Sequence, residues 1–359
     1  MGKKKREKRD KREKKYKKPK KQRRIYRTTI FIFLVDLLVA ACFFILYGPY
    51  SYFRNVLITT ALKTKTHAWI AYTFFDDKTI DKIKEQFSYI ELTDDVDLDK
   101  IVIDEDAVGK STNEYDKAIL TREKGNKYYK LINIEISGYD AHLVAIYKPS
   151  KVKLITSKSF NTGSGAETVK RICDRLGGLV CINGGMFQDP TGWGSDIPQG
   201  YLIKDGKVIW SDHNDKANLI GFTKDHKLIL LNATGEEAVQ KGVRDALEFG
   251  PFLIVNGKQI EQTTTAAGGY DRAARVAIAQ RRDGIVLFLV TEGVHTKGPT
   301  LKEMAETLAL YGAYNAANLD GGTSSQLVIK GELINTPLTI YGKKVDGGRA
   351  VVSGFGLIP

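Results

Sequence analysis

Alternating apolar and polar positions recur along most of the chain from residue 128 onward. A period of two in short segments rich in β-branched residues is typical of strands, and turns containing Gly, Asn or Asp separate these segments. The predicted strands are 128–136, 141–147, 152–156, 179–182, 200–203, 208–210, 219–223, 227–231, 252–255, 275–279, 285–291, 313–319, 326–329 and 350–358. Because many of them are joined by tight turns, we expect a mixed, largely antiparallel sheet.

Helical spacing of apolar residues occurs at only a few places. It predicts helices at 78–87, 166–176, 236–245 and 300–311. Thr300 and Glu303 have the spacing of a capping box at the start of the last helix, and Gly312 follows its end. Strands therefore outnumber helices, and the expected fold class is α+β, with a few helices packed on the sheet.

One segment near the N-terminus is apolar without any period. Residues 30–47 contain a single charged residue, Asp36, and with their flanks they predict a transmembrane helix over 28–50. Residues 1–27 hold 17 Lys/Arg and 3 Asp/Glu, which favours a cytoplasmic N-terminus and an extracytoplasmic C-terminal domain. A cleaved signal peptide is the alternative. The absence of a convincing small-x-small cleavage motif before residue 50 favours an anchor.

The net charge of +13 belongs to the basic tail, since residues 28–359 hold 38 Lys/Arg and 39 Asp/Glu. A neutral folded part argues against nucleic-acid binding. Acidic residues gather between 91 and 127, where we expect a solvated stalk or linker. The predicted parts are a basic cytoplasmic tail (1–27), the transmembrane helix (28–50), juxtamembrane helices with the acidic linker (51–127) and one domain (128–359).

Cysteine chemistry contributes little to the prediction. Cys173 and Cys181 are eight positions apart and would be able to pair outside the cell, but two buried free thiols are an equally good interpretation. No Cys/His spacing is typical of a zinc site. We therefore expect neither a metal nor a cofactor.

Three glycine turns at predicted strand ends carry polar groups: Asn183-Gly184-Gly185, Glu292-Gly293 and Asp320-Gly321-Gly322. The last is followed by Thr323, Ser324 and Ser325, so a carboxylate, three hydroxyls and a nest of backbone N–H groups are expected in one small volume. An ordinary hairpin turn is the alternative. A carboxylate can stabilise an oxocarbenium-like centre, while arginine and backbone N–H groups can bind phosphate. The motifs therefore fit glycosyl transfer from a phosphate.

In this order the motifs resemble those of the phosphodiester glycosidase family over roughly residues 128–359. The matching segments are 182–187 (I-N-G-G-F-F in the family), 275–278 (R-x-A-I), 291–293 (an acidic-Gly turn), 301–311 (L-x-E-x-A), 318–325 (N-L-D-G-G-G-S-S) and 349–351 (R-x-V). Met186, Glu292 and Thr323 depart from the residues that are usual in the family.

The resemblance implies a membrane-anchored bacterial hydrolase that cleaves a sugar-1-phosphodiester in a cell-surface or exopolysaccharide glycopolymer. It implies catalytic roles for Asp320, Glu292 and Arg275, with Arg275 as the phosphate ligand. The substrate-binding residues would be Asn183, Gly184, Gly185, Gly321, Gly322, Thr323, Ser324, Ser325 and Arg349. The expected partners are a carbohydrate phosphodiester and the membrane. The alternative is a membrane-tethered module that binds a cell-wall glycopolymer without cleaving it.

Overall fold

The computed structural model describes residues 20–48, 54, 57–58, 68–80, 96–103, 111, 113–163, 165–189, 194–261, 272–294 and 296–359. The chain divides into two compact units, 1–83 and 84–359. The first contains helices α2 (Lys20–Tyr47) and α4 (Ala68–Phe74). Within α2, Tyr26–Tyr47 is long and apolar enough to span a membrane, a property that a signal sequence shares. The helix predicted at 78–87 is helical through residue 80, and its remainder lies outside the described residues.

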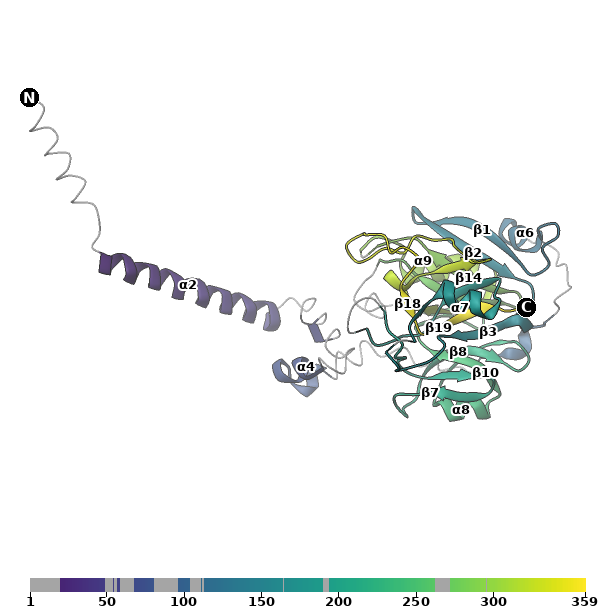
Figure 1. Cartoon of the computed structure of the whole chain (residues 1–359), viewed down its shortest axis with the longest axis horizontal. Helices are drawn as coiled ribbons and strands as arrows, with labels where there is room; N and C mark the ends of the chain where they lie inside the picture. Colours follow the sequence, from purple (N-terminus) through teal and green to yellow (C-terminus); the bar gives the residue numbers. More distant parts are fainter. Residues whose placement is uncertain are drawn as a thin grey trace, which may run out of the picture. The chain divides into compact units, whose positions relative to one another are not determined.

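The second unit is built mainly from three sheets, and every strand pair described in them is antiparallel (Figure 1). This confirms the α+β prediction. The seven-stranded sheet has the order β1 (Tyr129–Ile136), β2 (Tyr139–Ile146), β14 (Val286–Thr291), β13 (Val276–Arg281), β15 (Ala313–Leu319), β11 (Phe252–Val255) and β12 (Lys258–Gln259). One five-stranded sheet has the order β7 (Lys207–Trp210), β6 (Leu202–Lys204), β10 (Val243–Glu248), β8 (Ala217–Thr223) and β9 (Leu228–Ala233). The other has the order β17 (Glu332–Leu333), β16 (Leu327–Ile329), β5 (Val180–Asn183), β19 (Ser353–Leu357) and β3 (Val152–Thr156). A short ladder joins β4 (Glu167–Thr168) to β18 (Ala350–Val351).

The three sheets share one core because their strands are apolar on both faces. In β14, Val286, Phe288 and Val290 contribute to a central cluster that also contains Ile220 of β8 and Phe355 of β19. The alternate β14 residues, Leu287 and Leu289, face a second cluster. Period-two side-chain alternation therefore places one face of each sheet in the common interior and leaves the other face to be covered.

Helices cover the outer faces. Helix α9 (Leu301–Leu310) buries Leu301, Met304 and Leu308 against the seven-stranded sheet. Helix α8 (Gly235–Gln240) covers one five-stranded sheet through Ala238, and α7 (Val169–Leu176) covers the other through Ile172. The predicted capping box of α9 is present: Thr300 Oγ1 accepts from the Glu303 N–H (3.1 Å), and Glu303 Oε2 accepts from the Thr300 N–H (2.8 Å).

Two of the predicted helices are partly wrong. The helix predicted over 236–245 ends before Gly242, and its last residues belong to β10. Arg244 and Asp245 in this strand form a buried ion pair, Nε to Oδ2 at 2.8 Å, so polar residues occupy positions that would normally signal exposure. The helix predicted to begin at residue 166 begins at Val169, because Glu167–Thr168 pair with β18 and Thr168 caps the helix.

Part of the predicted acidic linker is packed within the second unit. Helix α6 (Glu114–Leu120) buries Ile119 in the cluster that also contains Met304, and Asp116 lies 3.0 Å from Arg281. Near the short 3-10 helix Leu98–Lys100, Ile101 is also buried. The prediction of a solvated linker is therefore wrong for these described stretches of 91–127.

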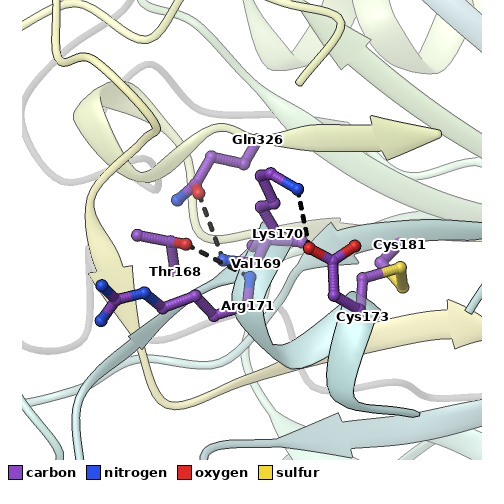
Figure 2. Close-up of a disulfide and its surroundings, with 8 residues drawn as sticks. Thr168, Val169, Lys170, Arg171, Cys173, Cys181 and Gln326 are labelled. Carbon is purple, nitrogen blue, oxygen red and sulfur yellow. Dashed lines mark hydrogen bonds and ion pairs between the residues drawn. A yellow bond between two sulfur atoms is a disulfide. The ribbon is translucent and has the colours of Figure 1, made fainter. Parts of the chain in front are cut away.

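Cys173 and Cys181 form a disulfide that joins α7 to β5 (Figure 2). This settles the alternative that the sequence left open, in favour of pairing. The bond fixes β5 two residues before its last residue, Asn183. The covering helix and the strand that leads into the first glycine turn are thus covalently linked.

Candidate active site

The pairing of β13 brings several predicted residues to one edge of the seven-stranded sheet. Val276 lies opposite both Leu319 of β15 and Val290 of β14. Because both pairs are antiparallel, the start of β13 meets the ends of its two neighbours. Arg275 therefore comes beside Asp320 and Glu292, although the three residues are far apart in the sequence.

The second sheet reaches the same edge through β5. The Asn183 side chain donates to the Asp320 backbone oxygen (Nδ2 to O, 2.6 Å), and the Asp320 N–H donates to the Gly184 oxygen (2.8 Å). The Asn183 Oδ1 atom also accepts from the Gln326 N–H (2.9 Å). Asn183 thus holds the backbone on both sides of the Asp320 turn, so we interpret it as a positioning residue.

Asp320 is placed in an unusual electrostatic environment. Burial raises the pKa of its carboxyl group to about 7, while hydrogen bonds from the Ser324 hydroxyl and the Gly321 N–H act in the opposite direction. The residue keeps part of its surface exposed. A carboxyl group that titrates near neutral pH and remains accessible is suited to proton transfer.

Arg349 contacts Ser324 and adds a cation to the polar groups around Asp320. Its Nη1 atom donates to Ser324 Oγ (3.3 Å), its Nη2 group forms an ion pair with Asp189, and its guanidinium stacks 4.9 Å from the centre of the Phe187 ring. Burial lowers the pKa of Arg349. Asp320, Ser324, Arg349 and Asp189 are therefore one connected chain of polar groups, which we call the Asp320 network.

The expected nest of backbone N–H groups is not formed. The N–H groups of Gly322, Ser324 and Ser325 donate to Ala274, Gly321 and Gly322, respectively, and that of Gly321 donates to the Asp320 carboxylate. These donors hold the turn in shape and do not converge on a ligand position. Only Gly322 of the glycine pair has a positive φ (59°), while Gly321 has a φ of −114°.

The glycines of this region serve close packing. A Cβ atom on Gly321 would lie 2.7 Å from the Ala274 oxygen, and one on Gly184 would lie 2.5 Å from Leu247 Cδ2. On Gly185 it would lie 2.7 Å from Ser353 Oγ. Thr323 lies in the 3-10 helix Gly322–Ser324 and needs no positive φ, so its departure from the family pattern does not disturb the turn.

Three other predicted residues, Glu292, Arg275 and Ser325, make contacts of their own near the site. The Glu292 carboxylate accepts from the Thr336 N–H (2.9 and 3.2 Å) and lies 3.6 Å from His142 Nε2. Arg275 is 5% exposed, and its N–H donates to Thr291 Oγ1 (2.9 Å). Ser325 is fully buried, and its hydroxyl has no hydrogen-bond partner among the described residues. Of this group, Glu292 is the residue with a partly exposed side chain.

The structure adds residues that sequence reasoning missed. Glu248 ends β10 beside the first glycine turn, since a Cβ on Gly185 would lie 3.9 Å from its backbone oxygen. Its carboxylate lies 3.0 Å from His213 Nε2 and accepts from the Tyr201 N–H (3.1 Å), and burial raises its pKa. Asp189, the partner of Arg349, lies in a loop rich in Gly and Pro. The signal for Glu248 in the sequence was an acidic residue two positions before the Gly250-Pro251 turn.

Comparison with known proteins identifies the class. Residues 177–358 match the family model of the phosphodiester glycosidases. The chain is 32% identical over 192 residues to the SPbeta prophage-derived uncharacterized protein YomE of Bacillus subtilis, covering 50% of this chain and 28% of that protein. It is 27% identical over 186 residues to N-acetylglucosamine-1-phosphodiester alpha-N-acetylglucosaminidase of mouse, covering 47% of this chain and 35% of the relative.

Among solved structures, the catalytic domain of the zebrafish N-acetylglucosamine-1-phosphodiester alpha-N-acetylglucosaminidase, auto-inhibited by its pro-peptide, has the same fold. Its TM-score is 0.53 at 19% identity, covering 64% of this chain and 82% of that one. The chain spans about a third of the length of the curated relatives it matches. The family match extends over half of the chain, so this protein belongs to the phosphodiester glycosidase family.

Proposed function

We propose that this protein hydrolyses the bond between the anomeric carbon of a sugar and a phosphodiester. The observation that carries the proposal is the Asp320 network, in which a carboxyl group with a pKa of about 7 is connected through Ser324 to a partly buried arginine, Arg349, at converging strand ends. The family membership supports the same reaction class.

In the proposed mechanism, the ionised Asp320 carboxylate stabilises positive charge that develops at the anomeric carbon and accepts the proton of the attacking water. A base whose pKa lies near the working pH is both available and strong enough for this task. The phosphate leaves with its negative charge already delocalised, so it needs cations more than it needs an acid. Arg275 is the proposed phosphate ligand, and Arg349 keeps Ser324 directed at Asp320.

The proposed substrate class is an N-acetylglucosamine-1-phosphodiester, because that compound appears in the names of the mouse relative and the zebrafish structure. The apolar helix Tyr26–Tyr47 and the basic tail support an anchored protein whose second unit lies outside the cytoplasm. A glycopolymer of the cell surface or an exopolysaccharide would then be within reach. A cysteine introduced at the exposed Asp346 should react with an impermeant maleimide on intact cells, and protection there would contradict this topology.

The test uses the full chain in detergent micelles with the methyl phosphodiester of α-N-acetylglucosamine-1-phosphate. We expect time-dependent release of N-acetylglucosamine as a reducing sugar, and we expect Asp320→Asn to release about a hundred-fold less. Binding of the substrate without any release by the folded protein would overturn the hydrolase proposal and favour a binding module.

A further inference from the structure

A charged cavity lies outside the Asp320 network. Its volume is about 720 Å³, and its walls come from the loop after β3 and from the first turns of α7. The lining residues are Lys158, Ser159, Gly165, Ala166, Glu167, Arg171 and Asp174. We call it the α7 cavity.

The balance of ion pairs makes the α7 cavity positive. Glu167 is neutralised by Arg175 (Nη2 to Oε2, 2.7 Å), and Asp174 is neutralised by Lys170 (2.7 Å); neither cation lines the cavity. In contrast, no described carboxylate lies within ion-pair distance of Lys158 or Arg171. Two cations, Lys158 and Arg171, are therefore available to an anionic ligand, although Lys158 also interacts electrostatically with Glu167.

A buried carboxylate holds one wall of the cavity in place. Asp196 is 4% exposed, and its Oδ2 atom accepts from the Thr162 N–H and hydroxyl (2.8 Å each) and from the Gly165 N–H (3.0 Å). Thr162 Oγ1 lies 3.2 Å from Ser159 Oγ. A Cβ on Gly165 would lie 2.4 Å from the Ser159 oxygen, so the wall requires glycine there. The loop is therefore shaped before any ligand arrives.

Gln326 connects the α7 cavity to the Asp320 network. It follows the serines of the turn, and its Oε1 atom accepts from the Val169 N–H at the start of α7 (3.3 Å), as Figure 2 shows. Its Nε2 atom donates to the Arg349 oxygen (2.8 Å). In addition, Ala350, next to Arg349, pairs with Thr168, next to the cavity residue Glu167. The cavity and the network are thus neighbours across one two-stranded ladder.

We propose that the α7 cavity is a subsite for a second phosphate group of the same substrate molecule, so the protein acts on chains of repeating sugar phosphates in preference to isolated phosphodiesters. The inference rests on the proposed function for its choice of ligand. The cations Lys158 and Arg171 bind the second phosphate, and the fixed wall keeps them in register with the Asp320 network.

The test compares a substrate with one phosphate, the methyl phosphodiester of α-N-acetylglucosamine-1-phosphate, with an oligomer of the same sugar that carries three phosphodiesters. The double variant Lys158→Ala/Arg171→Ala removes both cations. The matched control is Lys207→Ala/Lys241→Ala, which removes two exposed cations that do not line the cavity. All variants are made in the full chain and checked by thermal unfolding.

For the cavity variant, we expect KM for the oligomer to rise by roughly ten-fold with kcat unchanged, because two contacts from exposed cations are lost. Both kcat and KM for the one-phosphate substrate should stay unchanged. The control should behave as the unmodified chain does. An unchanged KM for the oligomer, or an equal loss with both substrates, would overturn the subsite. Binding of the oligomer to the Asp320→Asn protein is measured as well. A ten-fold weaker affinity on adding the cavity substitutions supports the subsite even if hydrolysis fails, and an unchanged affinity overturns it.

Discussion

The raised pKa of Asp320 predicts that this residue destabilises the folded protein at neutral and alkaline pH. The group has a pKa near 3.8 when unfolded and about 7 when folded. The folded state holds the proton more tightly than the unfolded state does. The contribution of Asp320 to the free energy of unfolding is therefore most favourable below about pH 4 and is lost as the pH rises through 7. A difference of roughly three pKa units corresponds to about 4 kcal/mol, which is an upper bound. Because the residue keeps some exposed surface, we expect about 1–3 kcal/mol.

Asp320→Asn removes the ionisation and keeps the shape, so it should reverse this loss. Thermal unfolding of the full chain in detergent is followed at pH 4.5 and pH 8.5. The melting temperature of the variant minus that of the unmodified chain should be about 3–9 °C larger at pH 8.5 than at pH 4.5. Asp346→Asn is the control, because that side chain is 92% exposed, and it should show no such change. An equal difference between Asp320→Asn and the unmodified chain at both pH values would refute the raised pKa.

Three further predictions concern the site and its support. If Asp320 acts as an ionised base, kcat/KM should increase with pH up to about 7 and then level off, and a decrease across pH 7 would assign it the role of an acid. Arg349→Lys keeps the charge but loses the forked guanidinium that reaches both Ser324 and Asp189. We therefore expect kcat to fall by about ten-fold or more with KM nearly unchanged. Full activity would show that Arg349 does not support catalysis. Replacing Cys173 and Cys181 with Ser should lower the unfolding free energy by about 2–3 kcal/mol in chemical denaturation, and a stability equal to that of the unmodified chain would show that the bond adds nothing.

The sequence placed the residues of the candidate site at strand ends and glycine turns because both are local features. Leu319 and Asp320 follow from an apolar run that ends at a turn, and Arg275 from a cation that opens a strand. Antiparallel pairing brings such ends together only once the order of the strands is set, and that order is long-range information that the sequence pattern did not supply.

The direction of the backbone N–H groups was beyond local reasoning. The Gly322 N–H donates to Ala274 and the Asp320 N–H donates to Gly184, and both acceptors lie just outside the ends of other strands. The sequence predicted a nest from its glycine content alone. In the structure, the N–H groups of Asp320 and Gly322 donate to backbone oxygens, and the strand register determines which oxygens lie close enough. For the same reason, the raised pKa of Asp320 depends on burial that the sequence does not contain.

The sequence pattern did not predict Glu248 as a site residue because a buried ion pair precedes it in the chain. Arg244 and Asp245 precede it, and their charges broke the alternation that would have predicted a strand over 243–248. The segment therefore resembled a continuation of α8. The pairing of Glu248 with His213 likewise depends on a contact between residues 35 positions apart.

Hydrolysis in ¹⁸O-labelled water distinguishes cleavage at the anomeric carbon of the substrate from cleavage at phosphorus. Attack on the anomeric carbon places the heavy oxygen on C1 of the released sugar, and mass spectrometry of both products gives its position. We expect labelled N-acetylglucosamine and unlabelled methyl phosphate, with the signal lost in Asp320→Asn. Label in the methyl phosphate would show attack at phosphorus and would overturn the proposed cleavage at the anomeric carbon.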